Sequence, residues 1–170
     1  MKKTSLSILL IVAFGLAILP ACGGGSSSSA PPPPPQPTTA VLTLLTSGLS
    51  TTIYGIEVTV VLPDGVTAKS TTAPPMTDTG VVTATGGAVG LDTYITGNYT
   101  AAAIPAKGSV LIEIAKTSGF GTGEYSTVNL NIVSANTPTA GGFSLTNFKP
   151  VDDKGVDLIG LTPGLTVSIK

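Results

Sequence analysis

The sequence predicts an all-β fold, an antiparallel β-sandwich of roughly nine strands, on three observations. Apolar and polar residues alternate along several short segments, which is the pattern of strands with one buried face. Turn residues recur about every 8–12 residues, a spacing typical of sandwiches and barrels. The segments between these turns lack the 3.6-residue apolar period of an amphipathic helix.

The clearest predicted strand covers residues 56–62, where every second residue is aliphatic: Ile56, Val58, Val60 and Leu62. Glu57 and Thr59 lie on the opposite face. Pro63-Asp64-Gly65 predicts a turn after this strand, because proline presets φ and glycine accepts a positive φ.

Three later segments repeat the alternation, at residues 110–114, 128–132 and 165–169. Alternation of this kind favours antiparallel sheets with one solvated face. Weaker strand candidates bring the predicted total to between about nine and eleven: residues 41–46, 66–71, 81–85, 88–94, 99–103, 142–148 and 156–159.

The start of the chain has the pattern of an export signal. Lys2 and Lys3 precede an apolar run at residues 6–19, which fits a signal-peptide core and is shorter than the roughly 20 residues that span a bilayer as a helix. The run ends at Leu19-Pro20-Ala21-Cys22, which resembles the bacterial lipobox. The resemblance implies that residues 1–21 are a signal peptide and that Cys22 is the lipid attachment site.

The alternative is an ordinary secretory signal with a coincidental cysteine. Cys22 is the only cysteine of the chain, so it has no disulfide partner in an oxidising compartment. Attached acyl chains would anchor the protein in a membrane of the cell envelope. The resemblance also implies the outer membrane in a Gram-negative cell, because Gly23 stands where an aspartate would mark retention in the inner membrane.

Residues 22–39 are expected to form the lipidated terminus and a linker. Glycine and serine fill residues 23–29 and prolines fill 31–35, so flexible coil is followed by stiff polyproline II. Residues 40–170 have an ordinary length for one domain with one core.

Composition excludes several classes of function. Charged residues make up 10% of the chain, histidine and tryptophan are absent, and all basic residues are lysines. Without a basic stripe or arginine, the sequence argues against a nucleic-acid partner. Without histidine, neither a histidine-based triad nor a histidine metal site can be built. Carboxylate, serine, lysine or tyrosine chemistry is still open to this composition, and the favoured prediction is a protein that is not an enzyme.

The order of the segments resembles a known family. The strand Gly55–Pro63 with its turn is followed by Gly108–Ile114, by Val128–Ile132, by Phe143–Phe148 and by an acidic turn before a final strand. This order is similar to cohesin-like modules and their carbohydrate-binding relatives, which are jelly-roll sandwiches. The resemblance implies a binding module that holds a dockerin-like protein or a polysaccharide on a sheet face.

Four tyrosines are the only amphipathic aromatic residues that could stack on a sugar: Tyr54, Tyr94, Tyr99 and Tyr125. The favoured interpretation is that they are strand residues with hydroxyls in water, and the alternative is a glycan platform.

Acidic residues offer two further candidates. Asp152, Asp153 and Asp157 could supply oxygen ligands to calcium, although a hairpin turn is the favoured interpretation because aspartate and glycine are preferred there. Strand carboxylates such as Glu57, Glu113 and Glu124 could hydrolyse a glycoside if two of them converged, and the sequence does not indicate that they do.

Two functions are favoured, ahead of an enzyme, which would need a carboxylate pair that the sequence does not reveal. The first is a membrane-anchored lipoprotein with a non-catalytic cohesin-like module for a protein partner or a polysaccharide. It requires no cofactor, and calcium is the one candidate. The second is a structural subunit of a cell-surface assembly that pairs through strand edges, which expose free N–H and C=O groups.

Overall fold

The computed structural model describes residues 31, 33–71, 75–133 and 135–170. The predicted signal peptide and Cys22 lie outside these residues. The folded domain comprises residues 34–170. Within the described ranges, no helix is long and apolar enough to cross a membrane.

Strands make up most of the described chain, with two short 3₁₀ helices, η1 (Gly86–Ala88) and η2 (Ala140–Gly142). The nine strands found among the described residues are β1 (Thr39–Gly48), β2 (Ile53–Val61), β3 (Val66–Thr67), β4 (Val82–Ala84), β5 (Thr93–Thr100), β6 (Ser109–Phe120), β7 (Gly123–Ile132), β8 (Ser144–Val151) and β9 (Leu161–Ile169).

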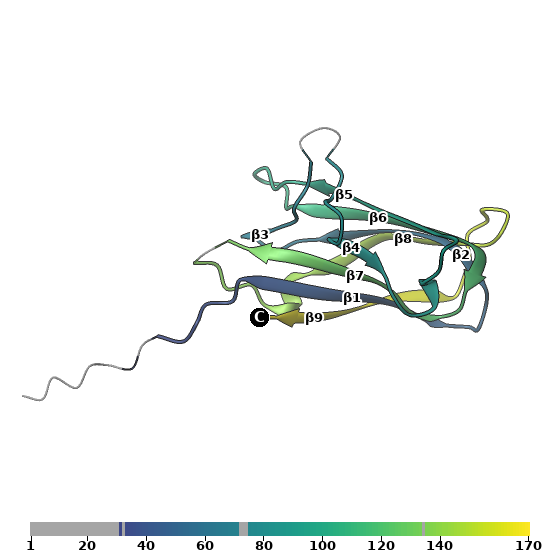
Figure 1. Cartoon of the computed structure of the whole chain (residues 1–170), viewed down its shortest axis with the longest axis horizontal. Helices are drawn as coiled ribbons and strands as arrows, with labels where there is room; N and C mark the ends of the chain where they lie inside the picture. Colours follow the sequence, from purple (N-terminus) through teal and green to yellow (C-terminus); the bar gives the residue numbers. More distant parts are fainter. Residues whose placement is uncertain (1–30, 32, 72–74, 134) are drawn as a thin grey trace, which may run out of the picture. The chain divides into compact units, whose positions relative to one another are not determined.

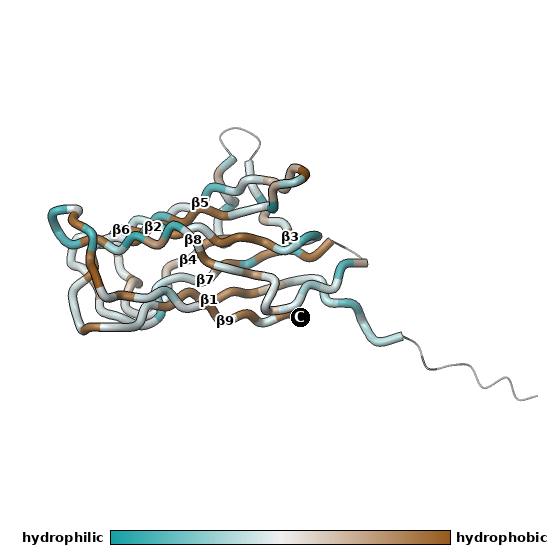
Figure 2. The backbone as a smooth tube through the Cα atoms, turned by 180° about the vertical axis from the view of Figure 1, so that it is seen from behind, coloured by the Kyte–Doolittle hydropathy of each residue, from teal (hydrophilic) through white to brown (hydrophobic). Residues whose placement is uncertain are grey.

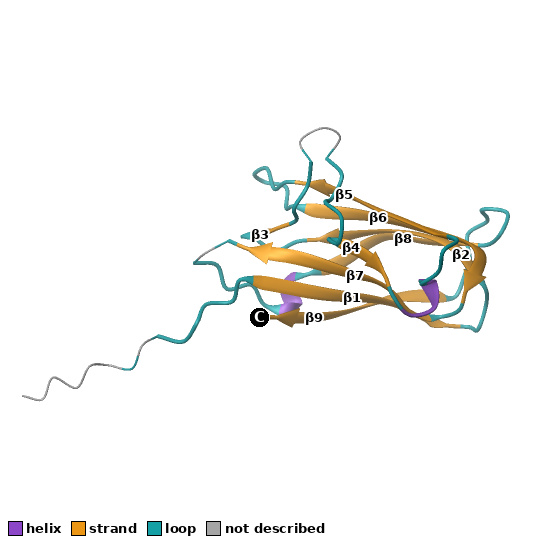
Figure 3. Ribbon diagram, viewed as in Figure 1, coloured by secondary structure: helices purple, strands orange, loops and turns teal. Residues whose placement is uncertain are grey.

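The strands form two stacked sheets (Figures 1 and 3). One sheet has the order β3-β7-β1-β9, with β4 also pairing with β7, and the other has the order β5-β6-β2-β8. Every pairing between these strands is antiparallel. The predicted all-β, antiparallel sandwich of about nine strands is therefore confirmed. Most consecutive strands lie in opposite sheets, so the connections cross the sandwich repeatedly.

The core lies between the sheets and follows the predicted alternation. The aliphatic residues of 56–62, 110–114 and 128–132 that were expected to share a face are all buried, and apolar residues recur along the strands of both sheets (Figure 2). The predicted turn is present, since the Val66 amide donates to the Pro63 carbonyl at 3.2 Å and Gly65 has a φ of 76°.

Three of the weaker strand candidates are wrong. Residues 88–94 and 99–103 do not form separate strands, because one strand, β5, spans the interval between them. Lys116 Nζ donates to the carbonyls of Gly87 and Val89 at 3.0 and 2.9 Å, which holds residues before β5 in a loop. Residues 156–159 form a loop in which Ile159 is 93% exposed. The apolar side chain of Ile159 is therefore not part of a buried strand face.

Candidate functional site

The outer surface of the β5-β6-β2-β8 sheet gathers most of the candidate residues. The register of β2 and β6 places Glu57 directly opposite Glu113. Thr96 lies beside Glu113 on one side, and Lys149 lies beside Glu57 on the other. Directly opposite residues have Cβ atoms about 4.5–5.5 Å apart. The fold thus brings together two carboxylates that the sequence left unpaired, and we call this surface the acidic face.

The carboxylate pair is only partly neutralised. Lys149 Nζ lies 3.8 Å from Glu57 Oε1, and the two side chains are 61% and 40% exposed. An ion pair this exposed contributes little to stability. No ion pair to Glu113 is found in the described part of the chain. Because like charges opposite one another destabilise a sheet, the face would gain from a bound cation.

Small residues leave a shallow depression beside the carboxylates. The row next to them contains Gly55 and Ala115, with Tyr94 and Val151 at its ends. A Cβ on Gly55 would lie 3.0 Å from Val151 Cγ2, so glycine allows the close approach of β2 and β8. The depression is about 310 Å³ and is lined by residues that include Glu57, Glu113, Lys149 and Asp157.

Two of the four candidate tyrosines lie next to Ala115, which lines this depression. Tyr94 pairs with Ala115 across β5 and β6 and is 63% exposed. Tyr54 lines an adjacent hollow of about 310 Å³ with Ala115, Lys116 and Asp153. Tyrosine combines an apolar ring with a polar hydroxyl. An exposed tyrosine can therefore contact the apolar part of a ligand while its hydroxyl stays in water.

A fixed loop borders the acidic face. The Ser118 amide donates to Asp92 Oδ2 at 2.9 Å, and Thr117 Oγ1 lies 3.2 Å from the same oxygen. These hydrogen bonds, chiefly those from Ser118, lower the pKa of Asp92 to about 2. Together with the Lys116 bonds they hold residues 86–92 against the end of β6.

The other two tyrosines are not part of this surface. Tyr99 packs against the core, and burial raises its pKa. Tyr125 is fully buried, so the expectation of a hydroxyl in water is wrong for this residue. Its hydroxyl has no hydrogen-bond partner among the described residues, and burial raises its pKa. The reason is a register shift between Leu44 and Leu45, which lets Tyr125 and Ser126 both face inward.

The acidic turn is a hydrogen-bonded turn. Asp152 Oδ1 accepts from the amides of Val156 at 2.8 Å and Lys154 at 2.9 Å. These bonds, that from Val156 first, lower the pKa of Asp152. Asp153 and Asp157 line different hollows of the acidic face. The residues that the structure describes contain no group of three metal-ligating side chains.

Sequence reasoning missed Lys149, Gly55 and Ala115. The alternation of β2 and β6 did put Glu57 and Glu113 on solvated faces, but it could not reveal that the two strands are neighbours. Glu124 lies on the other sheet, opposite Leu45.

Comparison with known proteins adds no relative: no protein-family model, no curated protein and no solved structure matches the chain.

Proposed function

We propose that this protein is an envelope lipoprotein, anchored through Cys22, whose cohesin-like domain is a non-catalytic binding module. Its ligand, a protein partner or a polysaccharide, lies on the acidic face. One observation carries the proposal: Glu57 and Glu113 stand opposite each other beside two partly or largely exposed tyrosines.

The chemistry of the face favours a ligand with a positive charge. Four carboxylates line its two hollows, from Glu57, Glu113, Asp153 and Asp157, against the two lysines Lys116 and Lys149. Lys116 is already bound to two carbonyls. A lysine side chain or a sugar amine placed between the glutamates would relieve their repulsion, while the tyrosine rings would contact apolar parts of the ligand.

The test is saturable binding of the full chain to solubilised native envelope, measured with and without calcium. A Tyr94→Ala, Glu113→Gln variant should lose at least about tenfold in affinity, since a stacked aromatic ring and a charged contact together exceed 1.4 kcal/mol. Glu124→Gln is the matched control, because it removes an exposed carboxylate from the other sheet. Equal binding by the double variant and by the control would refute the assignment to the acidic face.

A second candidate, assembly through strand edges, is supported by one observation. Thr39 and Lys170 exchange backbone hydrogen bonds. Along an antiparallel pair of strands, hydrogen-bonded and non-hydrogen-bonded residues alternate. The backbone amides and carbonyls of Leu165 and Val167 on β9 therefore point away from β1. In the described ranges, no strand pairs with that side of β9. By contrast, the edge of β5 is covered, since the Tyr99 amide donates to the Pro75 carbonyl at 2.8 Å.

Two features shorten the free edge of β9. Pro163 lies within the strand and η2 lies close to it, and both features hinder strand addition. Edge assembly predicts oligomers of the full chain whose mass rises with concentration in detergent and falls on a Val167→Pro substitution. A monomer at all concentrations would exclude this second candidate.

A further inference from the structure

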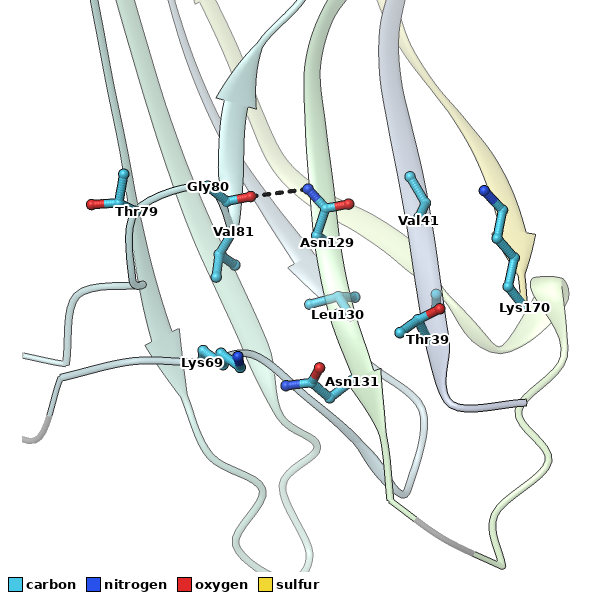
Figure 4. Close-up of a pocket in the computed structure, with 11 residues that line it drawn as sticks. Thr39, Val41, Lys69, Thr79, Gly80, Val81, Asn129, Leu130, Asn131 and Lys170 are labelled. Carbon is cyan, nitrogen blue, oxygen red and sulfur yellow. Dashed lines mark hydrogen bonds between the residues drawn. The ribbon is translucent and has the colours of Figure 1, made fainter. Parts of the chain in front are cut away.

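A surface of opposite charge lies on the outer side of the other sheet. It is a hollow of about 410 Å³ that crosses β7 and β1 near the start of β1 (Figure 4). Its lining includes two lysines and no acidic residue. We call it the basic groove, after the polar residues that line it: Thr39, Lys69, Thr79, Asn129, Asn131 and Lys170.

The fold holds these side chains in place. Asn129 and Asn131 are alternate residues of β7 and pair with Val41 and Thr39 of β1, so both amides face outward. Asn129 Nδ2 donates to the Gly80 carbonyl at 2.9 Å, which fixes one wall. Lys170 is fixed through its backbone, because its amide donates to the Thr39 carbonyl at 2.9 Å.

Hydrogen-bond donors line both sides of the groove. Figure 4 shows the side chains of Lys69 and Asn131 pointing toward one another across it, with Lys170 on the far side of β1. An ammonium group can only donate, and a side-chain amide has two donors. Within the described ranges, neither lysine forms an ion pair. Lys69 follows β3 and Lys170 follows β9, and these strands are three strand spacings apart, about 14 Å, so the two cations flank a polar shelf formed by β7 and β1.

From this arrangement we infer that the basic groove binds a polysaccharide that carries carboxylate or sulfate groups. Its anionic groups would meet Lys69 and Lys170, and its hydroxyls would bond to the amides and hydroxyls between them. Two lysines are too few for the many phosphate contacts of a nucleic acid. The groove also lacks the exposed large apolar side chains that enter a bilayer.

This inference does not depend on the proposed function, because the basic groove and the acidic face lie on opposite sides of the sandwich. Variants of one surface leave the other intact. Glu113→Gln should therefore leave binding in the basic groove unchanged, and a failure of either proposal can be recognised separately.

The experiment is titration of the full chain in detergent with dextran sulfate, and with neutral dextran as the uncharged probe. We expect binding to dextran sulfate that weakens with salt, and none to dextran. The Lys69→Gln, Lys170→Gln double variant should bind about tenfold more weakly, as loss of two exposed charge contacts predicts. Asn131→Asp, which places a carboxylate beside Lys69, should also weaken binding.

Lys107→Gln is the matched control, because it removes the same charge from an exposed loop outside the groove. It should change affinity less than twofold. Equal loss in this control, or no binding by the unmodified chain, would overturn the inference. Binding to vesicles that contain anionic phospholipid but not to dextran sulfate would overturn it too, in favour of a lipid surface. Circular dichroism would confirm that each variant is folded.

Discussion

The two outer surfaces of the sandwich share one core and differ in what they present to solvent. The acidic face carries the opposed pair Glu57 and Glu113. At mid-strand, the other surface instead carries a row of uncharged threonines, Thr83, Thr127, Thr43 and Thr166. Threonine pairs stabilise a sheet, whereas opposed like charges weaken it. The surface with the threonine row is thus arranged as a stable sheet, whereas the acidic face retains a repulsive contact. The cationic group of the proposed ligand would relieve that repulsion.

The largest expected effect tests whether the two surfaces depend on one core. Leu42 is fully buried on β1 between the sheets. Leu42→Ala should lower the free energy of unfolding by about 2–5 kcal/mol, measured by urea denaturation. Heating should then abolish binding at the acidic face and in the basic groove at the same temperature. Loss at two separate temperatures would show that the surfaces unfold independently.

A smaller change in the free energy of unfolding should distinguish the buried Tyr125 from the exposed Tyr94. Tyr125→Phe removes a buried hydroxyl that lacks a partner and should raise the free energy of unfolding by up to about 1–2 kcal/mol. Ligand binding should not change. Tyr94→Phe, the matched control on the acidic face, should leave stability unchanged. A loss of stability in Tyr125→Phe would mean that the hydroxyl has a partner, such as a buried water.

A still smaller effect tests the cost of the carboxylate pair. Glu113→Lys would place a cation opposite Glu57 and should stabilise the domain by about 0.2–1 kcal/mol, measured by thermal unfolding. The same change should abolish binding of a cationic ligand. Glu124→Lys is the control, since the residue opposite Glu124 is Leu45. Destabilisation by Glu113→Lys would contradict the proposed repulsion.

The smallest effect concerns the loop beside the acidic face. The pKa of Asp92 is lowered to about 2, so its contribution to the fold is complete above the ordinary pKa near 3.9 and is lost as the pH falls through about 2. The amide resonance of Ser118 should report this titration in NMR spectra, with a midpoint near pH 2. The Asp92→Asn variant should lack it. A midpoint near 4 would show that the hydrogen bonds to Asp92 do not hold in solution.

The inward-facing residues of the strands could be predicted from the sequence, because a strand with one buried face has an apolar residue at every second position. The aliphatic residues of β2, β6 and β7 were placed correctly for that reason. Strand neighbours could not be predicted, since β2 and β6 pair across more than 40 residues of chain and no local signal records the pairing. Glu57 and Glu113 were thus identified singly, whereas their pairing and the contribution of Lys149 required the fold.

Tyr125 shows a second limit of the pattern. One shifted residue in a strand reverses which side chains face the core, and the irregularity at Leu44 and Leu45 has no signature in the sequence. Exposed apolar residues such as Ile159 mislead in the opposite direction, because a loop can carry an aliphatic side chain without burying it.

The position of β1 has a mechanical consequence. The predicted linker precedes β1, which is hydrogen-bonded along its length to β7 on one side and to β9 on the other. Tension transmitted through the linker therefore enters the domain at a central strand. A force along β1 acts at the same time on its hydrogen bonds to β7 and on its hydrogen bonds to β9, so these bonds do not break one after another. Under the proposed anchoring through Cys22, the domain would bear the load between the membrane and a ligand bound to either of the proposed surfaces.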